Sequence, residues 1–138
     1  MKIPQNLIHL KHYLVGDELI DCQHLDMVKQ FEENKQDVPK AKLLNHARDL
    51  LQMWRVHIQC EEDLMLQIGY TYLEQHRKRH AEITGFFSNA IANVEQSREQ
   101  IFNRYNVIAN LQCTLMDHLD RDDQLLIPYI KAYRENKK

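Results

Sequence analysis

Helix breakers are rare in this chain, whose 138 residues include three glycines and three prolines. Glycine and proline interrupt regular structure most strongly, so their scarcity predicts long, uninterrupted elements. Apolar residues recur mostly at steps of three or four, which is the period of an amphipathic α-helix. The clearest stripe contains Leu43, Ala47, Leu50, Trp54, Ile58, Leu64 and Ile68. These features predict an all-α protein.

The breakers divide the chain into four helices, at about 18–35, 40–67, 71–95 and 97–134. Thr71 with Glu74, and Ser97 with Gln100, match the capping box that begins a helix. Pro128 is expected to kink the fourth helix. We expect no strands. Short connections between long amphipathic helices predict an antiparallel up-down-up-down four-helix bundle.

The length of 138 residues is that of one domain. We expect an irregular N-terminal arm over 1–15, the bundle over 16–134 and a solvated tail over 135–138. The apolar stripe of the fourth helix is expected to include Tyr105 and Leu125. Three cysteines without a close pair are expected to be free thiols: Cys22, Cys60 and Cys113. Cys22 and Cys113 are expected to be buried and inert.

The net charge of −2 argues against a nucleic-acid surface, which needs a basic patch. No apolar run approaches the roughly 18 residues that span a membrane. The N-terminus lacks the order of regions that makes a signal peptide. We therefore expect a cytoplasmic protein without nucleic-acid or membrane partners.

Polar residues interrupt the apolar stripes of all four predicted helices. The stripes pass through His24, His57, Glu61, His76, His80 and His118. A single buried histidine is usually a hydrogen-bonded core residue. Each unpaired buried polar group costs roughly 1–3 kcal/mol, against a total stability of about 5–15 kcal/mol. Six such groups therefore need a common partner, and metal ions suit imidazole and carboxylate together. The remaining histidines are expected to be surface or structural residues: His9, His12 and His46.

Counting ligands indicates two metal ions. Two octahedral irons offer about twelve positions, of which five imidazoles, two bridging carboxylates and an oxo or hydroxo bridge fill about eleven. About one position stays open. The second carboxylate must come from the fourth helix, where Asp120, Asp122 and Asp123 all lie close to His118. Ideal geometry favours Asp122, because Asp123 would lie about 140° round the helix unless the helix widens into a π-bulge.

Four segments together resemble the motifs of hemerythrins and bacteriohemerythrins, in the family's order and over roughly residues 14–130. The segments are Asp21-Cys22-Gln23-His24, His57-Ile58-Gln59-Cys60-Glu61-Glu62, Gly69-Tyr70 with His76-Arg77-Lys78-Arg79-His80, and His118-Leu119-Asp120-Arg121-Asp122-Asp123. The resemblance implies two non-haem irons joined by an oxo or hydroxo bridge. The implied ligands are Glu61 and Asp123 as bridges, His76, His80 and His118 on one iron, and His24 and His57 on the other.

The resemblance also implies reversible binding of dioxygen at the two-histidine iron. Dioxygen would take two electrons and the proton of the bridge, and so bind as a hydroperoxide. The expected function is carriage, storage or delivery of dioxygen rather than catalysis. NO or small anions such as azide would suit the same open position. The expected pocket residues are Met27, Val28, Leu115 and Leu119.

Three alternatives remain open from the sequence. Hemerythrin-like domains also occur fused to signalling domains such as diguanylate cyclases, which would make the chain an oxygen or redox sensor. A di-iron oxidase or ferroxidase usually draws glutamates from two helices and Glu-x-x-His from two others, a pattern that these stripes lack. The third alternative is a zinc site, but zinc prefers four-coordinate sites, for which seven ligands are too many.

Overall fold

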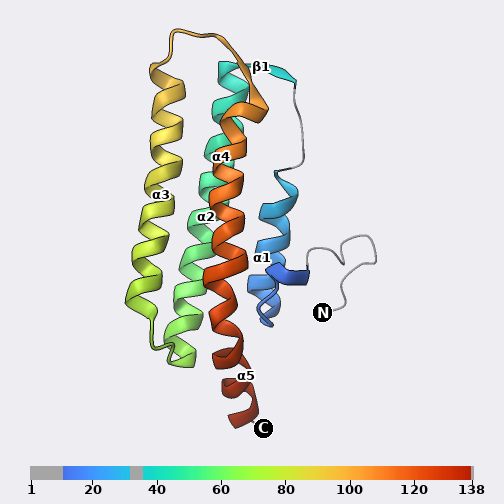
Figure 1. Ribbon diagram of the computed structural model, residues 1–138, viewed down its shortest axis with the longest axis vertical. Helices are drawn as coiled ribbons and strands as arrows, with labels where there is room; N and C mark the ends of the chain where they lie inside the picture. Colours follow the sequence, from blue (N-terminus) through green and yellow to red (C-terminus); the bar gives the residue numbers. More distant parts are fainter. Residues whose placement is uncertain (1–10, 32–35, 138) are drawn as a thin grey trace.

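Four helices lie side by side in alternating directions in the computed structural model, which describes residues 11–31 and 36–137 (Figure 1). They are α1 (Glu18–Lys29), α2 (Lys40–Ile68), α3 (Leu73–Gln96) and α4 (Arg104–Asp117). The last helix continues through irregular turns into α5 (Ile127–Asn136). This arrangement confirms the predicted all-α, up-down-up-down bundle.

Local capping explains how α1 and α2 are bounded. Asp17 accepts a hydrogen bond of 3.2 Å from the amide of Ile20 and so begins α1. Gly69 ends α2 in the left-handed conformation, with φ of 69°. The predicted extension of the first helix to residue 35 is wrong, because α1 ends at Lys29 and residues 30–31 form a turn. Residues 32–35 and the first ten residues of the arm lie outside the described part.

The two predicted capping boxes are wrong. Tyr72 precedes α3 without a side-chain capping bond, and the Thr71 hydroxyl instead accepts from the Tyr129 hydroxyl at 2.9 Å. The hydroxyl of Ser97 accepts from the Glu99 amide at 3.1 Å, but no helix begins there. Asn103 caps α4 instead, so the fourth helix starts seven residues later than residue 97.

A small antiparallel ribbon contradicts the expectation that the chain has no strands. Strand β1 (Asp37–Pro39) pairs with β2 (Ile101–Asn103), and Val38 lies opposite Phe102. Both strands belong to connections between helices, and these connections meet at the same end of the bundle (Figure 1). Pairing satisfies their backbone groups, which explains why this segment does not extend α4.

The irregular part of the fourth helix consists of a π-helix (His118–Asp122) and a 3₁₀-helix (Asp123–Leu126). Pro128, which was expected to kink the fourth helix, lies directly after this irregular segment, in the first turn of α5, where no donor is needed. The π-turn shifts the later side chains round the axis. Leu126 is therefore buried, whereas Leu125 is 59% exposed, against our expectation. Tyr105 was also expected inside and is 42% exposed.

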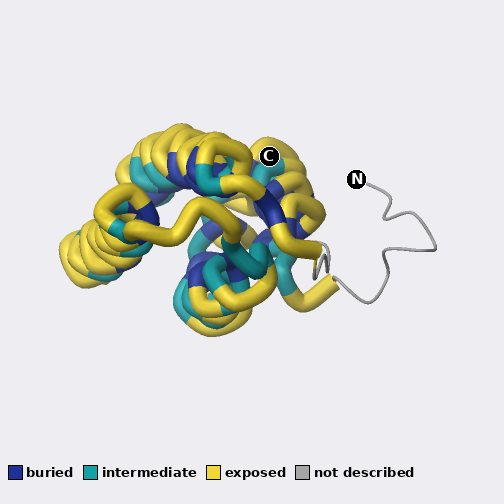
Figure 2. The backbone as a smooth tube through the Cα atoms, turned by 90° about the horizontal axis from the view of Figure 1, so that it is seen from above, coloured by how far each residue is buried: buried dark blue, intermediate teal, exposed yellow. Residues whose placement is uncertain are grey.

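The buried residues face inward from all the helices (Figure 2) and form two apolar clusters. The larger cluster surrounds Trp54, and the smaller one contains Met65, Tyr70 and Leu126. On α2, the residues between Trp54 and Met65 that point inward are His57 and Glu61. The structure therefore has a polar layer between two apolar ones.

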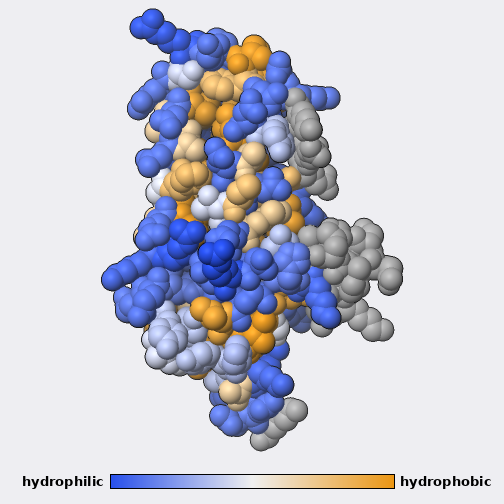
Figure 3. Space-filling model, viewed as in Figure 1, coloured by the Kyte–Doolittle hydropathy of each residue, from blue (hydrophilic) through white to orange (hydrophobic). Residues whose placement is uncertain are grey.

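One face of the protein carries exposed hydrophobic side chains near one end of the bundle. Figure 3 shows hydrophobic side chains at the upper end of one face, over a groove between α3 and α4 that Phe86, Phe102 and Val107 help to line.

Among the described helices, none has the length and apolarity needed to cross a membrane. The cysteines form no disulfide, and Cys22 and Cys113 are exposed rather than buried.

Candidate metal centre

Five imidazoles and two carboxylates meet in the polar layer between the apolar clusters. Each is at most 5% exposed, and together they come from all four helices of the bundle. The residues are His24, His57, Glu61, His76, His80, His118 and Asp123. The structure therefore brings together every residue that the sequence analysis predicts as a ligand.

These residues form two overlapping sets of potential ligand atoms. The first, five-ligand set consists of Glu61, His76, His80, His118 and Asp123. In it, the Nε2 atom of His76 lies 2.8 Å from Oε1 of Glu61 and 2.8 Å from Oδ1 of Asp123. Nε2 of His118 lies 3.0 Å from the same Oδ1 atom. One oxygen of each carboxylate therefore faces this set.

The second, four-ligand set consists of His24, His57, Glu61 and Asp123. Here the opposite oxygens of the carboxylates take part. Oδ2 of Asp123 lies 3.0 Å from Nε2 of His24, and Oε2 of Glu61 lies 3.1 Å from Nε2 of His57. Glu61 and Asp123 thus stand between the two sets, with one oxygen directed to each.

The contacts within the centre fit bound cations better than hydrogen bonds between side chains. Nε2 of His24 lies 3.3 Å from Nε2 of His57, and Nε2 of His80 lies 3.2 Å from that of His118. Neighbouring ligands of one octahedral ion at about 2.1 Å stand about 3 Å apart, which matches these pairs. Oε2 of Glu61 and Oδ2 of Asp123 are buried, and their contacts with His57 at 3.1 Å and His24 at 3.0 Å are ion pairs without the geometry of a hydrogen bond. Buried carboxylate oxygens need a partner, and a cation would supply it.

The charges of the metal-free centre show what a cation would replace. Burial alone would lower the pKa of His24, but its close contacts with the carboxylates of Asp123 and Glu61 outweigh burial and raise that pKa to about 10. The charge of Asp123 likewise outweighs burial at His118 and raises its pKa to about 10. For His76, the hydrogen bonds to the same carboxylates raise the pKa to about 9. These three rings hold protons that a metal ion must displace.

The two carboxylates shared by the ligand sets are held ionised by the same contacts. Burial would raise the pKa of Glu61, but the surrounding imidazoles, first His57, lower it well below its usual value. Burial and Glu61 oppose ionisation of Asp123, yet His118 and His24 lower its pKa as well. At His57, burial prevails and lowers the pKa.

The π-turn decides which aspartate enters the centre. In a regular helix, the residue four positions after His118 would share its face, and this residue is Asp122. The π-turn over 118–122 inserts one additional residue, so Asp123 points into the core and is fully buried. The structure has the local widening that a bridge at position 123 requires. Asp122 lies outside the centre, where its Oδ2 accepts from Nδ1 of His118 at 2.8 Å.

A second layer of acceptors orients the imidazoles, and the sequence analysis assigned no such role to them. Nδ1 of His57 donates to the amide oxygen of Gln23 at 3.0 Å, and Nδ1 of His80 donates to Glu62 at 2.8 Å. Gln23 and Glu62 each adjoin a ligand in the sequence, a signal that was available. Such hydrogen bonds fix the ring so that Nε2 points at the metal.

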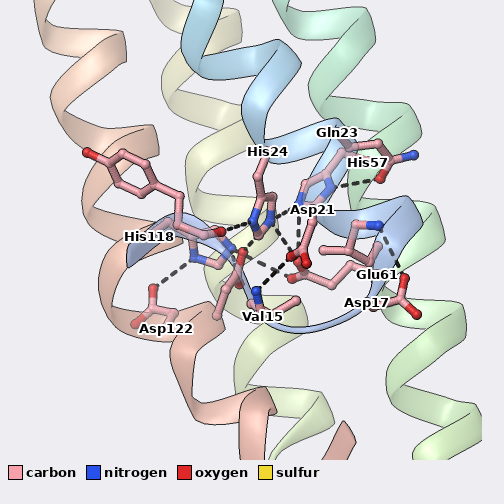
Figure 4. Close-up of polar contacts among 12 residues, drawn as sticks. Val15, Asp17, Asp21, Gln23, His24, His57, Glu61, His118 and Asp122 are labelled. Atoms are coloured by element: carbon pink, nitrogen blue, oxygen red, sulfur yellow. Dashed lines mark hydrogen bonds and ion pairs between the residues drawn. The ribbon is translucent and has the colours of Figure 1, made fainter. Parts of the chain in front are cut away.

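The arm supplies the acceptor for His24. Asp21 accepts from the amides of Val15 at 2.7 Å and Gly16 at 3.2 Å, which ties the arm to α1 (Figure 4). The carbonyl of Tyr13 then lies 2.6 Å from Nδ1 of His24. A backbone carbonyl leaves no side-chain signature, so the sequence could not indicate this contact.

Apolar residues close the centre on the side of the larger cluster. The ring of Trp54 meets those of His80 and His118 edge to face, at 5.4 and 5.5 Å between centroids. Its indole donates to Thr84 at 2.8 Å. The predicted pocket residues are all buried in this cluster: Met27, Val28, Leu115 and Leu119. Their contact with a ligand remains a prediction.

Of the other histidines, the two in the described part of the chain do not join the centre. His12 is exposed, and His46 is half-buried on α2 with its ring 3.3 Å from Arg104. His9 lies outside the described residues.

Comparisons with known proteins agree with this geometry. Residues 15–135 match the family model of the hemerythrin HHE cation binding domain. The chain is also 24% identical over 119 residues to a bacteriohemerythrin of Campylobacter jejuni subsp. jejuni serotype O:23/36 (strain 81-176). This alignment covers 83% of the chain and 88% of that protein. No solved structure gives a significant match.

Proposed function

This chain belongs to the hemerythrin HHE cation-binding family, and from that premise we propose that it holds two iron ions and binds dioxygen reversibly at one of them. The histidine and carboxylate cluster fits a di-iron centre. The number of ions, the ligand roles and the binding of dioxygen are the parts that we propose.

One observation carries the proposal: Glu61 and Asp123 belong to both ligand sets. Each carboxylate directs one oxygen to the five-ligand set and the other to the four-ligand set, at 2.8–3.1 Å from imidazole nitrogens. A single ion would leave the imidazoles of one set without a partner in a dry interior. Two ions joined by the carboxylates give every buried donor atom a role.

The two sets differ in how many ligands the protein provides. One set has three imidazoles and the other has two, besides the shared carboxylates. Octahedral coordination therefore leaves more room at the ion that His24 and His57 hold. We place the binding of dioxygen at that ion. Carriage, storage and sensing all begin with this step.

The protein's own residues orient the ligands and exclude water. Tyr13, Gln23, Glu62 and Asp122 fix the imidazole rings from outside. The apolar cluster around Trp54 keeps the centre dry, which protects a reactive ligand from proton exchange. When bound, two ferrous ions supply the electrons that dioxygen takes up on binding.

The composition of the centre supports binding rather than turnover. Di-iron oxidases and ferritin-like proteins take most of their ligands from glutamates on four helices. Here five of the seven candidate ligands are histidines. We therefore propose that the chain releases dioxygen unchanged.

The experiment is an anaerobic reconstitution with ferrous iron, followed by exposure to dioxygen and then by its removal. We expect about two irons per chain, a visible absorption band with dioxygen, and loss of that band under argon over repeated cycles. Azide serves as a probe that competes for the same position. Asp123→Asn is expected to abolish the band, and the exposed Asp120→Asn to retain it. Steady consumption of dioxygen with a reductant, or an unreversed spectrum, contradicts reversible binding.

A further inference from the structure

The acceptors behind the imidazoles differ in charge between the two ligand sets. In the five-ligand set, Nδ1 of His80 donates to the carboxylate of Glu62, and Nδ1 of His118 donates to that of Asp122, both at 2.8 Å. Among the described residues, His76 has no recorded outer acceptor. Two of the three imidazoles in this set therefore have anionic partners.

In the four-ligand set, both outer partners are neutral. Nδ1 of His57 faces the amide oxygen of Gln23 at 3.0 Å, and Nδ1 of His24 faces the backbone carbonyl of Tyr13 at 2.6 Å. Figure 4 shows Asp122 beside His118 and Gln23 beside His57, at opposite sides of the centre. The asymmetry in charge thus follows the asymmetry in ligand number.

Each outer carboxylate also contacts an arginine. Nε of Arg77 lies 3.1 Å from Oε1 of Glu62, and Nε of Arg79 lies 3.4 Å from Oδ2 of Asp122. Both arginines belong to α3, within the segment between His76 and His80. The result is two linked series, each made of an imidazole, a carboxylate and a guanidinium group.

These contacts have an electronic consequence for a metal at Nε2. An imidazole that donates from Nδ1 to an anion gains electron density and becomes a stronger ligand. A stronger ligand stabilises the ferric ion more than the ferrous ion, which lowers the reduction potential. A neutral amide or carbonyl acceptor adds less electron density to the imidazole and therefore lowers the reduction potential less. A guanidinium group that pairs with the carboxylate partly neutralises its negative charge. The carboxylate then increases the electron density of the imidazole less.

We propose that Glu62 and Asp122 are positioning residues that lower the reduction potential of the ion in the five-ligand set, and that Arg77 and Arg79 limit this lowering. The first electron removed from the reduced centre then comes from the five-ligand set. The ion with the open position keeps its electron longer. The inference rests on the proposed function in one respect, since it needs iron in both sets.

The test is an anaerobic redox titration of the iron-loaded protein, in which ferricyanide takes one electron from each ferrous ion and becomes ferrocyanide. Electron paramagnetic resonance follows the half-oxidised centre. We expect Glu62→Gln and Asp122→Asn each to raise the reduction potential of the first step by about 59 mV. For one electron, this shift is a tenfold change in the equilibrium constant. Arg77→Gln is expected to lower the same potential. Gln23→Glu, on the opposite side, is expected to lower the second potential.

The signs separate an electronic role from a structural one. Glu62→Gln and Arg77→Gln both remove the same ion pair, so a purely structural role shifts the potential in one direction for both. Glu74→Gln is the matched control, because Glu74 also contacts Arg77, at 2.9 Å, but is 75% exposed and touches no imidazole. Equal shifts in Glu62→Gln and Glu74→Gln overturn the proposal, as do shifts of equal sign in Glu62→Gln and Arg77→Gln.

The experiment also separates this inference from the proposed function. If Glu62→Gln releases iron, the pair Asp122→Asn and Arg79→Gln makes the same comparison at His118. Reversible dioxygen binding with unshifted potentials overturns the inference alone. The expected shifts without dioxygen binding overturn the oxygen-binding proposal alone. Fewer than two irons per chain in the unmodified protein overturns both.

Discussion

Asp122 and Asp123 are consecutive residues whose carboxylates lie on opposite edges of the same imidazole. Oδ2 of Asp122 is 2.8 Å from Nδ1 of His118, and Oδ1 of Asp123 is 3.0 Å from Nε2. The π-turn over 118–122 makes this arrangement possible, because it directs neighbouring side chains to the outside and the inside of the bundle. One aspartate can therefore hold the ring while the other shares its metal.

This relationship predicts different losses for the two aspartates. Asp123→Asn removes a shared carboxylate, so we expect the protein to lose at least one iron. Asp122→Asn leaves all ligands in place, and we expect it to retain both irons with an affinity about 10–100 times weaker. Metal analysis and competition with a chelator measure both effects. Equal iron contents and affinities in the two variants contradict the assignment.

Replacing Glu61 is expected to destabilise the metal-free protein. Glu61→Ala leaves protonated imidazoles buried without their counter-charge, and breaking a buried ion pair costs about 3–5 kcal/mol. Urea unfolding followed by circular dichroism measures the change. Asp63→Ala, two residues away on the exposed side of α2, is the control and should change the free energy of unfolding by about 0.5 kcal/mol or less. A loss in Glu61→Ala as small as in the control contradicts the burial of charge.

The stability of the metal-free protein should fall at alkaline pH. His24 and His118 have pKa values of about 10 when folded, above the ordinary histidine pKa of 6.5, so their contribution is complete below pH 6.5 and is lost as the pH rises to about 10. The lowered pKa values of Glu61 and Asp123 add stability that is lost on the acid side, below about pH 4.5. Unfolding at pH 6 and at pH 9 tests the alkaline loss.

Iron should remove this alkaline loss, because metal-bound Nε2 atoms no longer carry protons. Iron uptake should also release protons at neutral pH, which a weakly buffered indicator dye measures. If the metal-free protein is as stable at pH 9 as at pH 6, the paired charges are not formed.

The apolar pocket makes a separate prediction. Met27 and Leu115 lie three residues from His24 and His118, towards the larger cluster, and each is 1% exposed. Leu115→Ala should cost about 2–5 kcal/mol of stability and should shorten the lifetime of the dioxygen complex, because it admits water. The decay of the visible band in air measures that lifetime. Leu19→Ala, at a residue 57% exposed, should leave it unchanged.

The helices and the convergence of the candidate ligands were predictable because helical periodicity is a local property. His76 and His80, four residues apart, share one face of α3 in any regular helix. The same is true of His57 and Glu61 on α2. The structure shows that these side chains meet in one layer of the bundle.

Other features depended on contacts between distant parts of the chain. Regular helix geometry predicts Asp122 as the second carboxylate ligand, and only the family resemblance indicated Asp123. No local sequence signal predicts a π-turn. The pairing of Val38 with Phe102 joins two connections far apart in sequence, so it overrode the capping signal at Ser97. The carbonyl of Tyr13 reaches His24 because of how the arm folds back. Tertiary structure determines all three.

Anomalous diffraction at the iron edge tests the central claim most directly, using crystals of protein loaded anaerobically with ferrous iron. We expect two peaks about 3.5–4 Å apart, with Glu61 and Asp123 each contacting both. One set of imidazoles should surround each peak. A single peak, or none among the imidazoles, would contradict the account.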